Sequence, residues 1–515
     1  MKSHYSKYLV TFIIFCVSLP TLAQDSLSLY QNIENQLNQF RILNSDFYYN
    51  PAHMSDYSTF SFSNIRLNRQ RQNKEAYILQ EGKEYNEVSL EASSYKATQK
   101  NLSIWGEASY TSRKTKNVQW NNNIDLDRTN PIVIADSIGG TMNLQTYNFK
   151  GGFAKNIQKF TLGTELKYEA DLNYKTQDPR PKNTTSDLSL IFGTAYNINS
   201  KYAIGLAAGI NRYIQTTTVA FSSEVQRTAL YQMNGLGTYN FYFSNKSENA
   251  VFTDFVHNYL FTFGTKDQLF NIAVGTSYSN LKKDISLSKN SSASSNNSGY
   301  ETNRIDSQQT FASITKIVPI NMYYKIGSKI SYIKNKKTGT EIFYTNNTDI
   351  VSKLLENESY SSLYTNYDIN LIFQYQKNGT TLYIQPFYKK TKTNETKLDI
   401  ASQQNFDYDF IGTKLFYLQQ LNSKNVISIY VTYYKRALKN LPDELVLTQH
   451  QGINEWLISD NQIKQLDYHK FETAIRYDSK FLTKQSVYAI FAVDYHTFSN
   501  KTNNIQTTLS LGITF

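Results

Sequence analysis

The chain has 515 residues, of which 40% are hydrophobic and 18% are charged, and its formal net charge is +11. With 14% aromatic residues it is not an intrinsically disordered protein, because such chains have low hydrophobicity and few aromatic residues. The mean hydropathy is nevertheless polar, at -0.50, and the basic residues are scattered rather than gathered in runs. A solvated surface near lipid phosphates explains this charge better than a nucleic-acid site does, so we expect no nucleic-acid partner.

Residues 1–23 have the features of a secretory signal peptide. Lys2 and Lys7 form a basic region before an apolar stretch, YLVTFIIFCVSL, and TLA before Gln24 resembles the small residues of a cleavage site. The apolar stretch is shorter than a membrane-spanning helix requires. Cys16, the only cysteine, lies inside it, and the preceding IIF lacks the small residues of a lipoprotein site. We therefore expect a mature chain without disulfides or thiolate chemistry.

Residues 24–57 form a short segment before the first predicted strand. The stretch LYQNIENQLNQFRIL places Leu29, Ile33, Leu37 and Phe40 on one face of a predicted helix. An apolar helical face must be buried against something. Two placements fit: a periplasmic helix packed at the mouth of the domain that follows, or a small plug inside that domain.

From residue 58 onwards, apolar and polar residues alternate over stretches of about ten residues that are bounded by turns. LSIWGEASY, for example, places Leu102 and Ile104 on one face and Ser103 and Glu107 on the other. No long apolar run interrupts this pattern. The repeated period of two predicts an all-β fold in which residues 58–515 form a transmembrane antiparallel β-barrel.

Short and long connections alternate between the predicted strands. Short turns lie near residues 98–101, 155–158, 198–200, 265–267, 318–321, 377–380, 422–425 and 479–484, and longer polar stretches lie around 113–141, 219–255, 283–303, 336–357 and 439–462. Barrels of this class have short periplasmic turns and long external loops, so we predict about 18 strands and a periplasmic N-terminal segment. Counting 236–243 as a wall strand would break the alternation, so we place 219–255 in one external loop that can fold inward.

The predicted strands before residue 188 carry charged residues opposite their apolar faces. We expect these residues to face the lumen, because a charge near the lipid midplane costs about 2–4 kcal/mol. They form a lumen-facing charged wall of Glu87, Glu91, Glu107, Lys150, Glu165, Lys167, Glu169, Asp171 and Asp187. The wall could orient solutes in a water-filled pore, or its salt bridges could brace a closed barrel. The alternation of Glu165, Lys167 and Glu169 favours pairing over a ring of one sign.

The sequence ends on an alternating stretch, NNIQTTLSLGITF, in which Leu509, Leu511, Ile513 and Phe515 share one parity. This ending resembles the C-terminal β-signal of Gram-negative outer-membrane proteins. The last strand of an even barrel must pair with the first, because lipid does not tolerate an open strand edge. We therefore expect a closed barrel in the outer membrane of a Gram-negative bacterium, inserted by the barrel assembly machinery.

Several patches together resemble an uncharacterised outer-membrane β-barrel family of Bacteroidota. They are YYNPAHMSDY (48–57), EGKEYNEVSLEASSY (81–95), WGEASYTSRKTKNVQWN (105–121), ADSIGG (135–140) and DPRPKNTTSDL (178–188). The resemblance implies an outer-membrane location and a single barrel, and it transfers no functional residues. The NPA of residues 50–52 also resembles the sequence before the first strand of fatty-acid-transporter-like barrels, in which an N-terminal hatch plugs the lumen.

Enzymatic chemistry is the second class to weigh. Asp494 and His496 share a parity in VDYHTF, and Asp467 precedes His469 in LDYHK, so two Asp/His pairs near one rim could activate water. Such pairs arise by chance in a polar chain, and no two histidines have metal-ligand spacing. DLD, at 125–127, is a weak calcium motif. We expect no enzymatic activity, no catalytic residues, no metal and no cofactor.

These observations predict an outer-membrane barrel for passage or surface capture of a solute, with an accessory role in a TonB-dependent uptake system as one form of this function. The segment before residue 58 is too short to be the plug of a TonB-dependent receptor. The expected partners are outer-membrane lipid, lipopolysaccharide, and a TonB-dependent receptor or a surface lipoprotein. The alternative is a non-transporting barrel that docks surface lipoproteins or secretion machinery, and an interfacial hydrolase is a third, weaker reading.

Overall fold

The computed structural model describes residues 27–58, 60–98, 101–222, 228–244, 249–286, 299–345, 352–440, 445–482 and 485–515. The predicted signal peptide lies outside these residues. Among the described residues, no helix is both long enough and apolar enough to cross a lipid bilayer.

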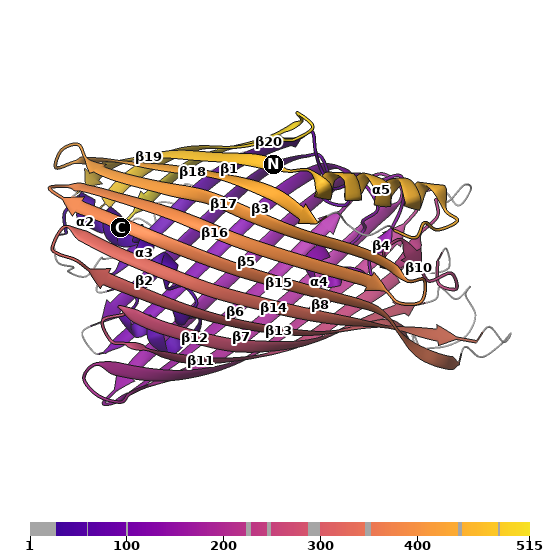
Figure 1. Ribbon diagram of the computed structural model, residues 1–515, viewed down its shortest axis with the longest axis horizontal. Coiled ribbons are helices and arrows are strands. Elements are labelled where there is room, and N and C mark those ends of the chain that lie inside the picture. Colours follow the sequence, from indigo (N-terminus) through magenta and orange to yellow (C-terminus); the bar gives the residue numbers. More distant parts are fainter. Residues whose placement is uncertain are drawn as a thin grey trace, which may run out of the picture.

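Eighteen strands form one closed antiparallel sheet (Figure 1). In chain order they are β1 (Phe62–Lys74), β2 (Glu84–Thr98), β3 (Leu102–Val118), β5 (Gly140–Ile157), β6 (Phe160–Tyr174), β7 (Arg180–Asn197), β8 (Tyr202–Ala220), β11 (Asn249–Thr265), β12 (Phe270–Ser286), β13 (Tyr300–Pro319), β14 (Tyr324–Tyr344), β15 (Lys353–Lys377), β16 (Thr380–Lys397), β17 (Ser402–Gln420), β18 (Asn425–Asn440), β19 (Tyr468–Leu482), β20 (Gln485–Phe498) and β21 (Asn503–Thr514). Strand β21 closes the barrel against β1, with Leu511 opposite Leu67. The predicted fold, a closed antiparallel barrel of about 18 strands, is confirmed.

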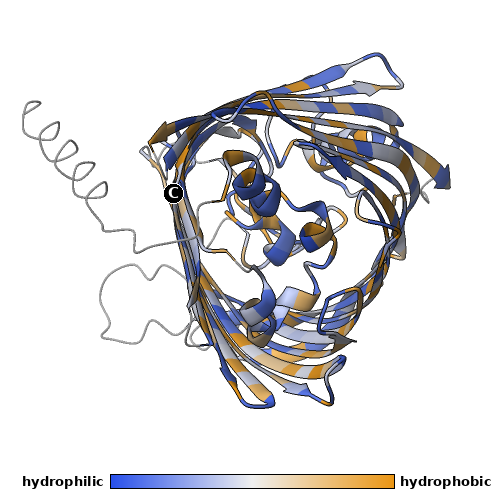
Figure 2. Ribbon diagram, turned by 90° about the vertical axis from the view of Figure 1, so that its left-hand side faces the viewer, coloured by the Kyte–Doolittle hydropathy of each residue, from blue (hydrophilic) through white to orange (hydrophobic). Residues whose placement is uncertain are grey.

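The two faces of the wall differ residue by residue, as the hydropathy colours in Figure 2 show along the strands. Large apolar side chains point outward, and Phe192 and Leu206 are 60% and 59% exposed there. Outward tyrosines pair between neighbouring strands, for example Tyr332 with Tyr367, whose ring centroids are 4.9 Å apart. An exposed apolar belt with amphipathic rings at its border is what a lipid bilayer requires of a barrel wall.

The two ends of the barrel are built differently. At one end, which we call the turn end, short connections join β2 to β3, β5 to β6, β7 to β8, β11 to β12, β13 to β14, β15 to β16, β17 to β18 and β19 to β20. Long connections join β3 to β5, β8 to β11 and β18 to β19 at the opposite end, the loop end (Figure 1). In barrels of this class the turn end faces the periplasm.

Four of the five predicted long loops, all except 439–462, are shorter than expected. The 113–141 loop begins only after Val118, and the 219–255 loop ends where β11 begins at Asn249. These strands extend further toward the loop end than the hydrophobic alternation indicates: residues 113–117 of β3 are polar on both faces, and at the start of β11 Ala250 and Phe252 pack into an apolar cluster with loop residues. The stretch predicted to turn inward does so: β9 (Tyr231–Gly235) and β10 (Thr238–Tyr239) form a small sheet with β4 (Ile134–Ala135).

At the turn end, the N-terminal segment lies inside the barrel, where Figure 2 looks directly onto its helices. It comprises α2 (Leu29–Gln36), α3 (Gln39–Leu43) and two 3₁₀ helices, η1 (Phe47–Tyr49) and η2 (Pro51–Asp56). Residues 29–43, read from the sequence as one helix, form two, because the Asn38 side chain accepts hydrogen bonds from the backbone N–H groups of Phe40 and Arg41 and starts a new helix. Of the two placements considered, the structure has the one inside the lumen.

At the loop end, three connections pack into one body that we call the loop cap, comprising residues 119–139, 228–244 and 445–467. It contains α4 (Leu126–Thr129), the three-stranded sheet and α5 (Gln451–Gln465). Its apolar core is built around Trp120, Tyr231, Met233, Ile453 and Trp456. The indole rings of Trp120 and Trp456 stack at a centroid distance of 5.5 Å. The long loops therefore have a hydrophobic core of their own.

Candidate functional site

The charged wall lies on the lumen side of β2 to β7. All nine residues have the parity opposite to that of the exposed apolar side chains on the same strands. Each has a polar partner: Arg113 with Glu87 at 2.5 Å, Arg66 with Glu91 at 2.5 Å, Lys150 with Glu107 at 2.7 Å, Trp105 with Glu165 at 2.7 Å, Lys167 with Glu169 at 3.3 Å, Thr146 and Thr185 with Asp171 at 2.5 Å, and Asn211 with Asp187. The wall is thus a network of mixed charge rather than a ring of one sign.

The N-terminal segment is anchored to the wall through Asn50, which is fully buried. Its Nδ2 donates hydrogen bonds to the carbonyl oxygens of Thr194 in β7, at 3.1 Å, and Leu206 in β8, at 3.3 Å. Its Oδ1 accepts a hydrogen bond from the backbone N–H of Ala52 at 3.0 Å and so begins η2. One side chain therefore ties the segment to two strands and shapes the segment itself.

Three wall glycines make room for this anchor. A Cβ atom at Gly163 would lie 2.4 Å from the carbonyl carbon of Pro51, and one at Gly193 would lie 2.0 Å from Asn50 Oδ1. One at Gly205 would lie 2.7 Å from Asn50 Nδ2. These distances are shorter than any van der Waals contact, so a side chain at these positions would displace the segment. We call Gly163, Gly193 and Gly205 the glycine seat.

His53 adds a second anchor beside the seat. Its Nε2 lies 2.7 Å from Thr262 Oγ1 of β11, and its ring stacks on Phe47 at a centroid distance of 3.7 Å. Burial without a charged partner lowers the pKa of His53 to about 3, because a desolvated imidazolium is unfavourable. The imidazole is therefore neutral at physiological pH. The NPA motif located this region in the sequence, but no local signal assigned roles to Asn50 and His53.

The remainder of the segment is held on the opposite side of the lumen by apolar packing. Phe40 and Tyr383 meet edge to face at 5.8 Å, within a cluster that includes Leu29, Ile33 and Phe416. The hydroxyl of Tyr30 hydrogen-bonds to Thr381, and Lys329 pairs with Asp46 at 2.8 Å. The segment thus contacts walls on both sides of the lumen.

The loop cap reaches down to the charged wall through Arg128 of α4. The guanidinium lies 3.4 Å from Asp187 Oδ2 and 3.8 Å from Asp254 Oδ2, and it stacks over the Tyr213 ring at 4.2 Å. Asp125, the first residue of the DLD motif, accepts a hydrogen bond from the Arg128 N–H and caps α4. Among the described residues, no group of three or more His, Cys, Asp or Glu side chains is arranged to hold a metal ion.

Two buried ion pairs also tie the loop end together, and sequence periodicity did not reveal them. Lys175 Nζ lies 2.9 Å from Asp136 Oδ2, with both side chains almost fully buried. Lys397 pairs with Glu341, whose second oxygen accepts a hydrogen bond from Asn234 of β9 at 2.9 Å. Such groups lie on segments far apart in the sequence, so only the folded chain identifies the partners.

The Asp/His pairs considered for catalysis differ from each other. His496 Nε2 lies 3.0 Å from Asp494 Oδ1, and Lys470 occupies the other carboxylate oxygen at 3.0 Å. Asp467 instead accepts a hydrogen bond from the Leu438 N–H at 2.7 Å. His469 hydrogen-bonds to Tyr433 at 2.8 Å. Of the two predicted pairs, only Asp494 and His496 are in contact, and the same carboxylate also pairs with Lys470.

The closed barrel has an apolar outer belt and a polar lumen, and the N-terminal segment and the loop cap lie at its two ends. These features define a transmembrane β-barrel of the outer-membrane type. Within that class, the chain belongs to a family of unknown function, DUF6850, whose family model matches residues 51–515. The resemblance to an uncharacterised outer-membrane barrel family is confirmed at this level, while the Bacteroidota origin stays a prediction.

Solved structures with a similar fold include the ferric yersiniabactin uptake receptor FyuA from Yersinia pestis, with a TM-score of 0.40, 8% identity and coverage of 88% of this chain and 80% of that chain. The siderophore receptor PiuA from Acinetobacter baumannii has a TM-score of 0.41 at 8% identity, covering 89% of this chain and 82% of that chain. The copper transporter OprC has a TM-score of 0.38 at 7% identity, covering 87% and 80%. No curated protein matches the sequence.

Proposed function

We propose that this protein is a gated outer-membrane barrel that passes or captures a polar solute. The observation that carries the proposal is the seating of the N-terminal segment in the lumen, where hydrogen bonds from Asn50 and packing on the glycine seat hold it against β6, β7 and β8. A segment held by hydrogen bonds and packing can leave and return. The mixed-charge wall above it suits a polar solute rather than an apolar one.

The proposed gate has two parts, one at each end. The N-terminal segment narrows the turn end, and the loop cap narrows the loop end through Arg128 and the Lys175–Asp136 pair. Capture at the loop end and release at the turn end would then be separate steps. An accessory role beside a TonB-dependent receptor in a Bacteroidota outer membrane belongs to this proposal.

Conductance of the purified protein in planar bilayers tests the proposal. We compare the wild type with a chain lacking residues 27–57 and with Gly205→Ala, whose new methyl group would meet Asn50 and His53. Gly209→Ala is the matched control, because Gly209 lies on the same strand and face but next to Ile191. Deletion and Gly205→Ala should raise conductance, and Gly209→Ala should not. A deletion as silent as the wild type would contradict gating by the N-terminal segment and would favour a docking platform for lipoproteins or secretion machinery.

We also propose that the chain is not an enzyme. Asp494 is engaged by Lys470, and the His496 ring stacks on Tyr468 at a centroid distance of 5.2 Å. These contacts account for both residues as part of the lumen wall. Ester and peptide substrates offered to the purified barrel should give no hydrolysis that Asp494→Asn or His496→Gln abolishes, and such a loss would establish the hydrolase instead.

A further inference from the structure

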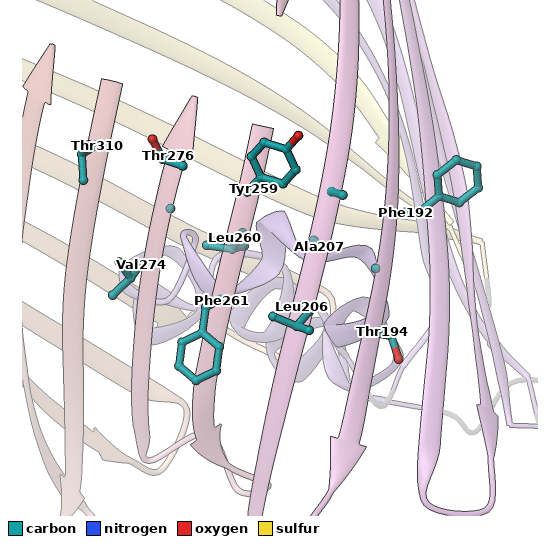
Figure 3. A pocket seen from close by; sticks show the side chains of 13 residues that line it. Phe192, Thr194, Leu206, Ala207, Tyr259, Leu260, Phe261, Val274, Thr276 and Thr310 are labelled. Atoms are coloured by element: carbon teal, nitrogen blue, oxygen red, sulfur yellow. The ribbon is translucent and has the colours of Figure 1, made fainter. Parts of the chain in front are cut away.

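The outer wall carries an apolar hollow between β7 and β13. Its volume is about 560 Å³, and it is lined by outward side chains that include Phe192, Leu206, Tyr259, Phe261 and Val274 (Figure 3). Its base is made of small residues, Ala208, Thr276 and Thr310. Because Phe192 and Leu206 have the parity of the lipid-facing belt, the hollow opens to the membrane and not to the lumen.

A second hollow, of about 470 Å³, lies on the outer wall between β11 and β14. Most of its lining residues carry a polar group, among them His257, Tyr278, Asn280, Asp306, Gln308 and Lys336, and Phe255 adds an apolar ring. The Asp306 carboxylate accepts a hydrogen bond from Asn280 Nδ2 at 2.6 Å. Gln308 Nε2 donates to the Tyr278 hydroxyl at 3.3 Å. The side chains thus form a shallow polar surface with amide and hydroxyl groups at hand.

Strand register shows that the two hollows adjoin. Tyr259, Thr276 and Thr310 lie side by side on β11, β12 and β13, and Lys334 is opposite Thr310 on β14. The next outward row, two residues closer to the loop end, contains His257, Tyr278, Gln308 and Lys336. An apolar hollow therefore passes directly into a polar one, and the polar part lies toward the loop end.

The polar hollow has a positive border. Lys334 and Lys336 are both exposed on the outer face of β14. Two strands away, β16 carries Lys392 in the same row as Lys334, but its ammonium group pairs with Asp407 at 3.3 Å. Asp306 is the carboxylate within the hollow, and an amide already hydrogen-bonds to it. An anionic group in the polar part would therefore meet two exposed ammonium groups and one carboxylate, a net positive charge.

We propose that this composite groove binds one phosphorylated glycolipid of the outer leaflet. An acyl chain would occupy the apolar hollow, because burial of its methylene groups is favourable there. The phosphate would lie at Lys334 and Lys336, and sugar hydroxyls would hydrogen-bond to Gln308, Asn280 and Tyr278. The order of the two hollows matches a lipid of the external leaflet, whose headgroup lies toward the loop end. This binding surface is independent of solute passage through the lumen.

Native mass spectrometry of the full chain in detergent micelles tests the proposal, with diphosphoryl lipid A as the probe. The wild type should retain one lipid at concentrations where a dephosphorylated analogue is lost. The pair Lys334→Gln and Lys336→Gln should weaken retention about tenfold or more, because each lysine near an anionic headgroup contributes to binding. Filling the apolar hollow by Thr276→Phe and Thr310→Phe should also lower retention.

Lys114→Gln with Lys116→Gln is the control, because these exposed lysines lie on the outer face of β3, away from the groove; Lys116 there pairs with Glu84 at 2.9 Å. This control should retain lipid as the wild type does, and excess inorganic phosphate should not release it. Folding of each variant is checked by the heat-dependent gel shift of the barrel. Equal losses in both lysine pairs, or equal retention of the dephosphorylated analogue, would refute a specific groove. Release by inorganic phosphate would show that the border binds free phosphate instead of a lipid.

Discussion

The side-chain amide of Asn50 donates a hydrogen bond to the carbonyl oxygen of Thr194 at 3.1 Å, across a sequence separation of 144 residues. The contact joins the lumen segment to the barrel wall at a position where the neighbouring residue of the strand is a glycine. Mutation of Asn50 therefore tests directly whether this contact keeps the N-terminal segment docked at the turn end.

Asn50→Ala should loosen the segment while leaving the barrel intact. The change removes the bonds to two buried carbonyl groups and the cap of η2, and a buried polar group left without its partner costs about 1–3 kcal/mol. The rate of limited proteolysis within residues 27–58 should therefore rise, because the segment leaves its docked position more often. Ser45→Ala, at an exposed position of the same segment, serves as the control. Unchanged proteolysis of Asn50→Ala would show that apolar packing alone holds the segment.

Docking of the segment should depend on pH through His53. Its pKa falls from 6.5 in the undocked chain to about 3 in the docked one. Between these values the undocked form binds a proton that the docked form excludes, so docking weakens as the pH falls below about 6.5, by up to about 1.4 kcal/mol per pH unit.

Two carboxyl groups of the segment act in the opposite direction. Burial raises the pKa of Glu34 and of Asp56, so the docked state takes up protons more readily than the undocked state and acidification favours docking. His53→Gln should therefore reverse the sign of the dependence below pH 6.5. Hydrogen exchange of the segment, followed from pH 7.5 to about 5 in both proteins, measures the difference. Identical profiles would remove His53 as the cause.

The buried pair of Lys175 and Asp136 should hold the first loop of the cap. Lys175→Met leaves the Asp136 carboxylate buried without its cation, which costs about 3–5 kcal/mol. Adding Asp136→Asn should restore part of the loss, because no charge is then left unpaired. Trp120, which lies in the cap core, reports the change by fluorescence during urea titration. Strictly additive effects of the two changes would contradict direct pairing.

Charge placed in the outer belt should destabilise the barrel according to depth. Phe491, 55% exposed on the outer face of β20, should tolerate lysine poorly, at a cost of about 2–4 kcal/mol near the midplane and about 0–1 kcal/mol near the interface. Thr497 lies on the same face of β20, closer to the loop end, and Thr497→Lys is the near-interface control. Unfolding in lipid vesicles gives both values, and equal costs would mean that Phe491 does not face hydrocarbon.

The sequence by itself determined the barrel, its number of strands and the direction of its charged wall. These properties depend on the period of two along each strand, which is a local pattern, and on lipid, which tolerates neither an unpaired edge nor a charge. Glu87 and Leu90 take opposite faces whatever their distant partners are. Leu509, Leu511 and Ile513, the predicted β-signal residues, likewise lie on the outer face of the closing strand.

Tertiary structure alone decided what fills the barrel. The glycine seat could not be read from the sequence, because each glycine is explained only by the segment that packs on it from more than a hundred residues away. The partners of Arg128 and Lys175, and the meeting of the two outer hollows, likewise come from register between strands. Periodicity specifies which face a side chain occupies, whereas its contacts depend on closure of the whole sheet, which brings distant segments together.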